Sequence, residues 1–341
     1  MSLQSPKNSF SIRILGTGSY VPPRVLSNAG LQEMGLNTTD EWIRKRTGIK
    51  ERRIADPDKA TSDLAYEAAV EALDDAGLSA ADLDLIILAT ITPDTCCPSG
   101  ANWLQSRLKA AQAVTFDITA ACSGFIFGLN VAEQYLRSGA CKYVMVAASE
   151  TMSRTLDWTD RTSCILWGDG AGAAILSGGD RGPEILSTHL HTDGEKGQDL
   201  LLPGGGSKTT PISHASVDQG LHFLKLIEAK YSFRVAVRYF IEAIEEASQY
   251  NQIPIDAFDW FIPHQANVRM FQAMAGKLKV PMEKFYVTLD RYGNISSASC
   301  AIALNEAVRD KRIRPGQLIC MPVFGGGLTW GSAVILSLIH I

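Results

Sequence analysis

The feature that most constrains the fold of this 341-residue chain is a weak repeat between its two halves. The matching segments, in order, are 84–90 with 259–264, 115–122 with 287–294, and 168–176 with 325–335. Duplication of one α/β unit explains this shared order, so the sequence predicts two similar units, at residues 1–180 and 181–341. Packed together, two such units would bring equivalent strand ends to one central site.

Short apolar runs alternate with segments of helical periodicity, which is the pattern of a layered α/β fold. The sequence predicts strands at 11–18, 85–90, 114–118 and 143–148, and helices at 61–76 and 124–137. The nearly continuous hydrophobicity of the strands is typical of strands covered on both faces. Thr61 or Ser62 is the expected cap of the first helix. The stretch 193–219, with its glycines and prolines, is predicted to be a long loop.

Charge and hydropathy argue against several classes of protein. The formal net charge of −4 argues against a general nucleic-acid binder, whose surface is basic. No apolar run reaches the ~18–20 residues needed to cross a bilayer, and the polar residues 1–10 do not form a secretory signal. Seven scattered cysteines are typical of reduced thiols, and adjacent Cys96 and Cys97 lack the spacing of metal ligands. We therefore expect a cytoplasmic protein with no nucleic-acid, membrane or metal partner.

Cys122 is the first candidate catalytic residue. It lies between a predicted strand and the predicted helix 124–137, among small residues that permit a tight turn and the approach of a substrate. A cysteine at the N-terminus of a helix is favoured as the thiolate, which is the nucleophilic form. The alternative is a buried structural cysteine, which is what most free cysteines are.

His264 and Asn294 become candidates through their positions. His264 follows an apolar strand and precedes the start of a helix, and strand ends are where α/β folds place their chemistry. Asn294 stands opposite Cys122 in the repeat. Taken alone, the histidine could be a structural hydrogen-bonding residue and the asparagine a turn residue. The predicted duplication favours a shared site instead.

Two glycine clusters need separate interpretations. Gly16 and Gly18 lack the rest of a dinucleotide-binding fingerprint, because position 21 is valine, so nucleotide binding is poorly supported. Gly326, in the glycine run that follows Phe324, would let the backbone approach a reacting carbonyl and offer an N–H to an oxyanion. A simple hairpin turn is the alternative for that run.

Several long motifs in one order carry a family resemblance that covers residues 12–336. These motifs are 40–48, 121–124, 168–172, 263–267, 293–294 and 324–332. Through them the chain resembles the β-ketoacyl-acyl carrier protein synthase III family of the thiolase superfamily. The resemblance implies a thiolase-like α/β fold of five layers, α-β-α-β-α, built from two pseudo-repeated halves and working as a homodimer.

The same resemblance implies a reaction. It is the decarboxylative Claisen condensation of an acyl-CoA primer with malonyl-acyl carrier protein, which gives 3-oxoacyl-acyl carrier protein and initiates fatty acid synthesis. The catalytic residues of the family fall on Cys122, His264 and Asn294. Gly326 would supply an oxyanion N–H beside that of Cys122, and Phe324 would help exclude water. Acyl-CoA is a substrate here, and no cofactor is implied.

Three further sets of residues match binding positions of the family. The positions that match coenzyme A contacts are Trp42, Arg46, Thr47, Arg161 and Asn267. The positions that match the basic carrier-protein footprint are Arg234 and Arg269, and those that match the acyl pocket are Cys97, Met152 and Trp167. An indole can stack on adenine, and an arginine pairs with phosphates. A solvated charged loop is the alternative for the first set.

The sequence departs from the family in two places. Segment 221–233 carries Ala229 where glycine is expected, with a small insertion before it. Cys97 stands where many members have a bulky aromatic residue that reaches across the dimer to close the acyl pocket. Because cysteine is much smaller than phenylalanine, we expect the far end of that pocket to be roomier.

Four alternatives remain at this stage. The first is a specialised enzyme of the same type that uses a longer, branched or aryl primer in secondary metabolism. A degradative thiolase fits less well, because Cys320 lacks the Cys-x-Gly setting of the second thiolase cysteine. A non-enzymatic scaffold would have lost one of the three catalytic residues, and all three are present. A nucleotide-binding protein of the Rossmann type is the alternative from a distant class.

Overall fold

The computed structural model of the chain describes residues 3–4, 11–179, 183–198, 200–207, 211–227 and 229–337, but not the side chains of 3–4 and 229–232. Two expectations fall outside this set. The predicted division after residue 180 lies among residues 180–182. The side chain of Ala229 and the residue before it are also outside the described set. Both expectations stay predictions.

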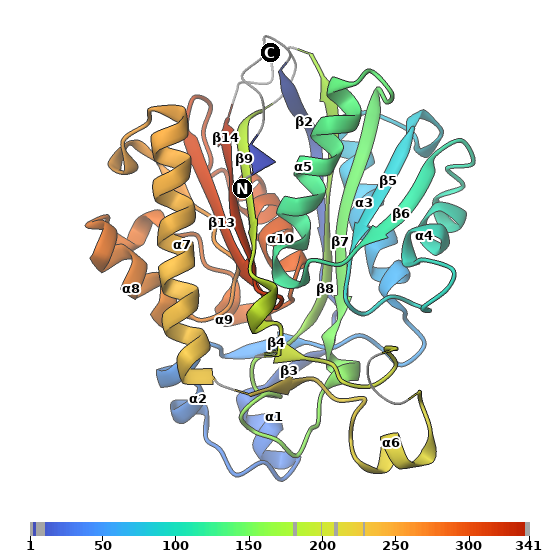
Figure 1. Cartoon of the computed structure of the whole chain (residues 1–341), viewed down its shortest axis with the longest axis vertical. Coiled ribbons are helices and arrows are strands. Elements are labelled where there is room, and N and C mark those ends of the chain that lie inside the picture. Colours follow the sequence, from blue (N-terminus) through green and yellow to red (C-terminus); the bar gives the residue numbers. More distant parts are fainter. Residues whose placement is uncertain are drawn as a thin grey trace.

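One hydrogen-bonded sheet runs through the described part of the chain (Figure 1). Its strands, in spatial order, are β12 (Trp260–Phe261), β13 (Leu318–Gly325), β14 (Thr329–Leu336), β9 (Glu184–Thr192), β2 (Ile12–Tyr20), β8 (Asp169–Gly178), β7 (Tyr143–Thr151), β5 (Leu85–Ala89) and β6 (Val114–Ile118), with β1 (Leu3–Gln4) paired to β9. Two residue pairs, Ile12 with Ile185 and Arg13 with Glu184, join β2 to β9. The sheet therefore consists of two halves that meet along a short seam.

The two halves of the sheet repeat one arrangement. In the first half, β5 lies parallel to β6 and β7, β8 runs antiparallel to β7, and β2 follows. In the second half, β12 is parallel to β13, β14 runs antiparallel to β13, and β9 follows. Phe285 forms a parallel bridge to Phe261, at the position that β6 occupies beside β5. This topology confirms the repeat predicted from the sequence.

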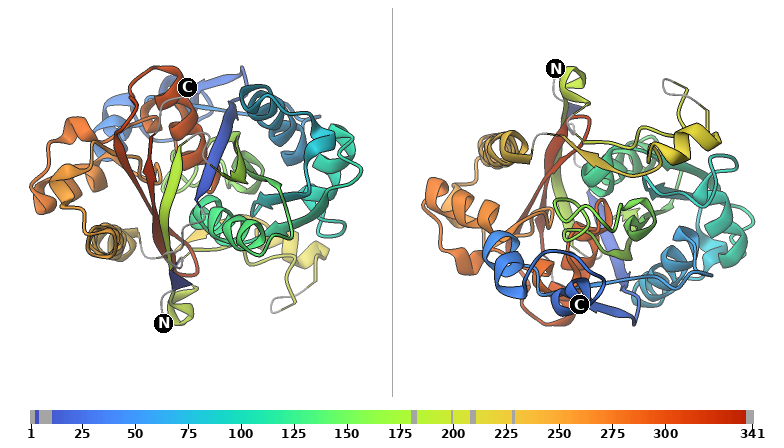
Figure 2. Two further views of the ribbon diagram at one scale, coloured as in Figure 1. Left: turned by 90° about the horizontal axis from the view of Figure 1, so that it is seen from above. Right: turned by 90° about the horizontal axis from the view of Figure 1, so that it is seen from below.

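Helices cover and separate the two halves of the sheet (Figures 1 and 2). On one outer face, α3 (Thr61–Ala76) and α4 (Gly100–Leu108) pack against strands of the first half. On the other outer face, α7 (Ala229–Asn251) packs against the second half, with α8 (Val268–Leu278) beside it. Between the halves lie α5 (Gly124–Arg137) and α10 (Ala298–Arg309), which contact each other. The order is α-β-α-β-α, so the expected fold class is confirmed.

Each contact between layers has its own hydrophobic core. The core between the halves includes Phe125 of α5 and Ile302 of α10. On the outer face of the first half, α3 and α4 bury mainly alanine and leucine side chains. On the outer face of the second half, α7 and α8 bury aromatic side chains such as Phe240 and Phe271. Every residue of β5 is buried, as its continuous hydrophobicity predicted.

Shorter elements, several of them at the lower end of Figure 1, complete the fold. They are β3 (Val25–Ser27), α1 (Asn28–Glu33), α2 (Asp40–Thr47), β4 (Glu51–Arg53), β10 (Leu200–Leu201), α6 (His214–Asp218), β11 (Lys225–Leu226) and α9 (Leu289–Tyr292). The stretch 193–219, predicted to be a long loop, also contains β10 and α6. Proline and glycine favour turns between these short elements, while β10 pairs with β11 and α6 forms its own backbone hydrogen bonds.

The predicted helices 61–76 and 124–137 and the predicted strand 114–118 have the bounds of α3, α5 and β6. The predicted cap of α3 was wrong. Its N-cap residue is Ala60, whose N–H donates to the carboxylate of Asp63 (2.7 Å). The hydroxyl of Thr61 instead donates to the carbonyl of Thr92. The Thr61 side chain is therefore used in a tertiary hydrogen bond and does not cap the helix.

The described residues hold neither a candidate membrane span nor a candidate metal site. None of the helices there has both the length and the apolar character that crossing a bilayer would require. Nor do these residues bring together three histidine, cysteine, aspartate or glutamate side chains that could hold a metal ion.

Close packing of α3 on β2 depends on glycine. A Cβ at Gly18 would lie 2.2 Å from the carbonyl oxygen of Ala68 and 2.5 Å from the backbone nitrogen of Ala72. We expect Gly18→Ala to lower the free energy of unfolding by about 1–3 kcal/mol, the usual cost of overpacking a core, as measured by urea denaturation. Gly276→Ala on α8 is the control, because a Cβ there would meet nothing within 4 Å. Equal losses in the two variants would contradict this account.

Candidate active site

Cys122 lies in a sharp turn between β6 and α5. The turn, η2 (Ala121–Ser123), begins with a residue at φ 46° and leaves Cys122 only 5% exposed. The hydroxyl of Thr329 donates to the carbonyl of Ala120 (3.0 Å), and the hydroxyl of Ser123 donates to the carbonyl of Thr329 (3.2 Å). Because Thr329 begins β14, the second half of the chain holds the turn that carries the candidate nucleophile.

Gly325, the last residue of β13, packs directly on the same turn. A Cβ at this position would lie 2.7 Å from the backbone nitrogen of Cys122 and 3.1 Å from that of Ser123. Any side chain here would therefore displace the cysteine. Gly326 follows and lines the same cavity as Cys122. The glycine run thus lies beside the thiol, where a hairpin turn without chemistry had been the alternative.

The surroundings of the Cys122 thiol disfavour its ionisation. Burial raises the pKa of Cys122 to about 12, and the nearby carboxyl of Glu150 adds to the rise. The hydroxyl of Ser296 lowers the same pKa. The sequence predicted a thiol favoured as thiolate by the N-terminal end of α5, whereas burial of the sulfur raises its pKa.

His264 follows β12 and is 2% exposed. Its backbone N–H donates to the carbonyl of Pro322 (3.0 Å), which keeps this part of the chain aligned with β13 beyond the end of β12. Burial lowers the pKa of the imidazole to about 3, so the ring is neutral at physiological pH. Its Nδ1 is enclosed by protein without a hydrogen-bond partner.

Asn294 follows α9, and two hydrogen bonds of its backbone fix its position. Its N–H donates to the carbonyl of Leu166 (2.8 Å), and its carbonyl accepts from the N–H of Gly168 (3.0 Å). The side-chain oxygen accepts from the backbone N–H of Ser296 (2.8 Å). Because that oxygen is already bonded, the amide NH₂ is the end of the side chain that can donate to a ligand.

The three candidate catalytic side chains line one cavity of about 790 Å³. They reach it from the turn before α5, from the chain after β12 and from the chain after α9, so the fold brings together Cys122, His264 and Asn294 as the repeat predicted. Much of the remaining lining is apolar: Ile165, Leu166, Trp167, Leu200, Leu226, Phe233, Ala236, Ala266, Met270, Phe324 and Leu328. The cavity can therefore surround an uncharged acyl chain next to three polar groups.

Most of the residues matched to coenzyme A contacts meet at the same cavity. Trp42, Arg46, Thr47 and Asn267 line it. The guanidinium groups of Arg46 and Arg161 lie 4.1 and 5.1 Å from the centre of the Trp42 ring, so Arg161 joins this group although it does not line the cavity. The hydroxyl of Thr47 already donates to the carbonyl of Ile43 (2.8 Å).

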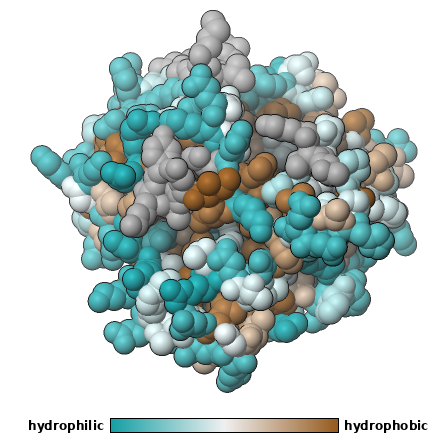
Figure 3. Space-filling view, turned by 60° about the horizontal axis from the view of Figure 1, so that its bottom comes forward, coloured by the Kyte–Doolittle hydropathy of each residue, from teal (hydrophilic) through white to brown (hydrophobic). Residues whose placement is uncertain are grey.

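Arg234 and Arg269, the positions matched to carrier-protein docking, are both exposed and both line the cavity. Arg234 lies on α7 and Arg269 on α8, so two helices of the second half supply the charge. The lower end of the molecule in Figure 1 is turned towards the viewer in Figure 3, where hydrophobic residues (brown) lie among hydrophilic ones (teal). Arg234 and Arg269 thus form a basic rim beside an apolar surface, which suits a ligand with an acidic part and an apolar part.

The residues matched to the acyl pocket separate into two groups. Met152 and Trp167 are buried and belong to the same hydrophobic cluster as Cys122, and Trp167 also lines the cavity. Cys97 is exposed and does not line the cavity. Within one chain, therefore, the structure does not bring Cys97 to the thiol.

Sequence reasoning missed Glu150, which is fully buried near Cys122. Its carboxylate accepts from the hydroxyls of Ser297 (2.8 Å), Thr92 (2.8 Å) and Thr90 (3.1 Å) and from the N–H of Ile91 (3.0 Å). Burial raises the pKa of this carboxyl. One signal was available: the glutamate comes one serine after an apolar run, near a strand end where this fold gathers its polar groups.

Comparisons with known proteins identify one family of enzymes to which the chain is similar. Family models described as 3-oxoacyl-[acyl-carrier-protein] synthase III match residues 116–194, and those described as its C-terminal part match residues 249–336. The chain is 47% identical over 323 residues to a β-ketoacyl-[acyl-carrier-protein] synthase III from Thioalkalivibrio sulfidiphilus, covering 95% of this chain and 98% of that protein. It is 48% identical over 322 residues to the protein of that name from Caldanaerobacter subterraneus, covering 94% and 96%.

A solved structure supports the same assignment. The crystal structure of 3-oxoacyl-[acyl-carrier-protein] synthase III from Aquifex aeolicus superposes with a TM-score of 0.87 at 41% identity, covering 95% of this chain and 99% of that one. Identity at this level extends over nearly the whole of each compared chain, and the segments that the family models match include the thiol, the imidazole and the amide. The chain therefore belongs to the β-ketoacyl-[acyl-carrier-protein] synthase III family.

Proposed function

We propose that this enzyme initiates fatty acid synthesis by condensing an acyl-CoA primer with malonyl-acyl carrier protein, releasing carbon dioxide, coenzyme A and a 3-oxoacyl-acyl carrier protein. The observation that carries the proposal is the cavity in which a thiol, a neutral imidazole and an amide NH₂ converge. Such a set provides a nucleophile and two uncharged hydrogen-bond donors, which is what thioester condensation needs. Membership of the synthase III family supports the same reaction.

In the first half-reaction, the sulfur of Cys122 attacks the carbonyl carbon of the acyl-CoA thioester. The carbon–sulfur bond to coenzyme A breaks, and coenzyme A leaves as a thiol with the proton that Cys122 gives up. The backbone N–H groups of Cys122 and Gly326 would stabilise the oxyanion. The close packing of Gly325 on the Cys122 backbone supports this arrangement, because it holds the glycine run against the turn.

In the second half-reaction, His264 and Asn294 donate hydrogen bonds to the thioester carbonyl of the malonyl group. Carbon dioxide leaves, the resulting enolate is stabilised by the two donors, and its carbon attacks the acyl-cysteine, which frees the Cys122 sulfur. A neutral imidazole suits this role when its proton is on the nitrogen that faces the cavity. Phe324 in the lining would help keep water from the enolate.

The aromatic and charged residues at the mouth of the cavity would recognise the two substrates. Trp42 would stack on the adenine of coenzyme A. Arg46 and Arg161, which in this structure lie over the indole ring of Trp42, would bind the phosphates. Arg234 and Arg269 would attract the acidic surface of the carrier protein. Thr47 and Asn267 would line the mouth of the cavity between these two binding regions. The proposed chemistry needs no cofactor and no metal.

We further propose a cytoplasmic homodimer. Seven free thiols, all within the described residues, suit a reducing compartment. β6 is the last strand at one edge of the sheet, and Val114 on it is 65% exposed. An exposed apolar edge strand is a template for pairing with another chain. A second copy of the chain would also cover the exposed segment that carries Cys97.

The nucleophile can be tested by removing it. Cys122→Ala should abolish acyl loading and condensation, and Cys122→Ser should be nearly inactive, because a hydroxyl without a dedicated base is a much weaker nucleophile. Mass spectrometry of the intact protein after incubation with acetyl-CoA measures the loading. Cys141→Ala is the control and should load like the wild type. A stable acyl adduct on the Cys122→Ala protein would refute the assignment.

The roles of His264 and Asn294 predict that the two half-reactions separate. His264→Ala and Asn294→Ala should still load acyl groups onto Cys122, whereas decarboxylation of malonyl thioester should fall ~10²–10³-fold, the usual cost of one such donor. Because burial holds the pKa of His264 near 3, wild-type decarboxylation should show no titration of this group between pH 5 and 8. Release of labelled carbon dioxide measures the rate. Wild-type decarboxylation in both variants would rule the roles out.

The place of Cys97 predicts the choice of primer. If a second chain brings Cys97 to the acyl pocket, the pocket should accept primers longer than acetyl, with about a fourfold gain per additional buried methylene. Cys97→Phe should shorten the preferred primer, as measured by kcat/KM for acetyl-, butyryl-, hexanoyl- and octanoyl-CoA. Cys96→Phe, one residue away, is the control. A chain-length profile that Cys97→Phe leaves unchanged would show that this position does not limit the pocket.

A further inference from the structure

Gln265, the residue after His264, makes an unusually complete set of contacts. It is 0% exposed. Its amide nitrogen donates to the carbonyls of Pro263 (2.8 Å) and Tyr286 (3.2 Å), and its amide oxygen accepts from the N–H groups of Thr288 (2.9 Å) and Leu289 (3.2 Å). Every hydrogen-bonding position of this amide is therefore used, and every partner is a backbone group.

The oxygen end of Gln265 caps α9. This helix begins at Leu289, and its own N-cap residue, Thr288, makes no side-chain capping bond. The first N–H groups of a helix lack partners within it, and here the glutamine, from a distant part of the chain, supplies an acceptor for two of them. The start of α9 is thereby fixed relative to the residue that follows His264.

The nitrogen end of Gln265 joins two neighbouring segments. One segment, just beyond β12, contains both Pro263 and Gln265. The other segment contains Tyr286 and leads into α9. These segments are already aligned one step earlier, where the N–H of Tyr286 donates to the carbonyl of Phe261 (2.9 Å). The glutamine extends this alignment past the point where backbone pairing ends and the two chains diverge towards the site.

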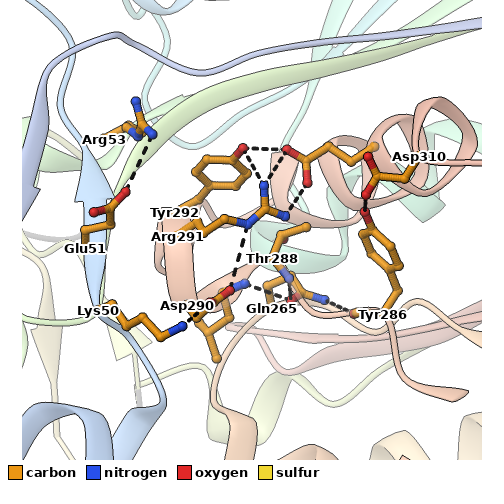
Figure 4. A network of polar contacts seen from close by, with 12 residues as sticks. Lys50, Glu51, Arg53, Gln265, Tyr286, Thr288, Asp290, Arg291, Tyr292 and Asp310 are labelled. Atoms are coloured by element: carbon orange, nitrogen blue, oxygen red, sulfur yellow. Dashed lines mark hydrogen bonds and ion pairs between the residues drawn. The ribbon is translucent and has the colours of Figure 1, made fainter. Parts of the chain in front are cut away.

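α9 transmits the position of its start to Asn294. The helix is four residues long, and Asn294 comes two residues after its end. Carboxylates of the α10 region also hold α9 and the residues before it, since Glu306 binds Arg291 and Tyr292, and Asp310 accepts from Tyr286 (Figure 4). Gln265, also drawn in Figure 4, binds the backbone N–H groups at the start of α9.

We propose that Gln265 is a positioning residue that sets the separation of the two donors, His264 and Asn294, and thereby the rate of the malonyl half-reaction. The inference rests on the proposed function. The glutamine does not line the cavity, so it acts through its neighbours and not on the substrate. Misplacement of a reacting group by about 1 Å costs ~10²-fold in rate, and the loss of three hydrogen bonds between two short segments permits a shift of that kind.

The test separates positioning from general support of the fold. In Gln265→Met, which keeps the length of the side chain and removes its polar groups, decarboxylation of malonyl thioester should fall by ~10–10²-fold. Acyl loading of Cys122 should change by less than about threefold, because all four hydrogen bonds of Gln265 go to residues outside the η2 turn and the glycine run. A purely structural role would lower both rates together.

Gln317→Met is the matched control. Gln317 also links separate segments, near the other end of β12, where its side-chain oxygen accepts from the N–H of Arg314 (2.7 Å) and from the indole of Trp260 (3.2 Å). Its loss should lower the unfolding temperature and leave the ratio of the two half-reaction rates unchanged. A fall in that ratio as large as in Gln265→Met would overturn the inference.

Gln265→Glu gives a second readout that does not depend on the stability of Gln265→Met. The glutamate keeps an acceptor for Thr288 and Leu289 but, when ionised, places a carboxylate oxygen against the carbonyls of Pro263 and Tyr286. Protonation restores one donor, so decarboxylation relative to the wild type should recover as the pH falls. A ratio that is flat with pH, with loading and decarboxylation equally reduced, would contradict the proposal.

A double variant completes the test. If Gln265 acts through the donors, Gln265→Met should cost less decarboxylation in a His264→Ala background than in the wild type. Full additivity would overturn the inference while leaving the proposed function intact. A wild-type protein that neither loads acyl-CoA nor decarboxylates malonyl thioester would instead overturn the proposed function, and the inference with it.

Discussion

The rest of the site depends on one contact between the halves of the molecule, the packing of Gly325 on the backbone of Cys122. No side chain fits between them, and the hydrogen bonds of Thr329 to Ala120 and Ser123 lie on the same contact. The proposed nucleophile belongs to the first half of the chain, whereas the strands that hold it belong to the second. A gap between the halves of even one methyl group would separate the glycine run from the backbone of Cys122, where we propose that the oxyanion is held.

Burial gives the polar groups of the cavity their chemical character. It keeps His264 neutral, which suits a hydrogen-bond donor to an enolate and excludes an imidazolium acid. It also raises the pKa of Cys122 and of Glu150, so the same enclosure that excludes water from the condensation makes the thiolate harder to form. The end of α5 and the hydroxyl of Ser296 oppose that effect, and the reactivity of the thiol reflects the balance.

Much of the fold and the three catalytic candidates could be predicted from the sequence, because both follow from local patterns. Helix α5 and strand β6 had the predicted bounds, and the repeat correctly paired Cys122 with Asn294. The cap of α3 could not be predicted, since Thr61 is drawn to Thr92 by a tertiary contact. Nor could the roles of Glu150 and Gln265 be predicted, because both depend on partners from other segments of the chain.

The sequence by itself determined the layered α/β class, the duplication and the identity of the reactive groups, since periodicity, turn residues and residue chemistry are local properties. The tertiary structure decided what those groups can do. It set the neutral state of His264, turned the NH₂ of Asn294 outward by binding its oxygen, and left Cys97 exposed and away from the cavity of its own chain. Each of these outcomes depends on burial or on a hydrogen bond between residues that only folding brings within reach.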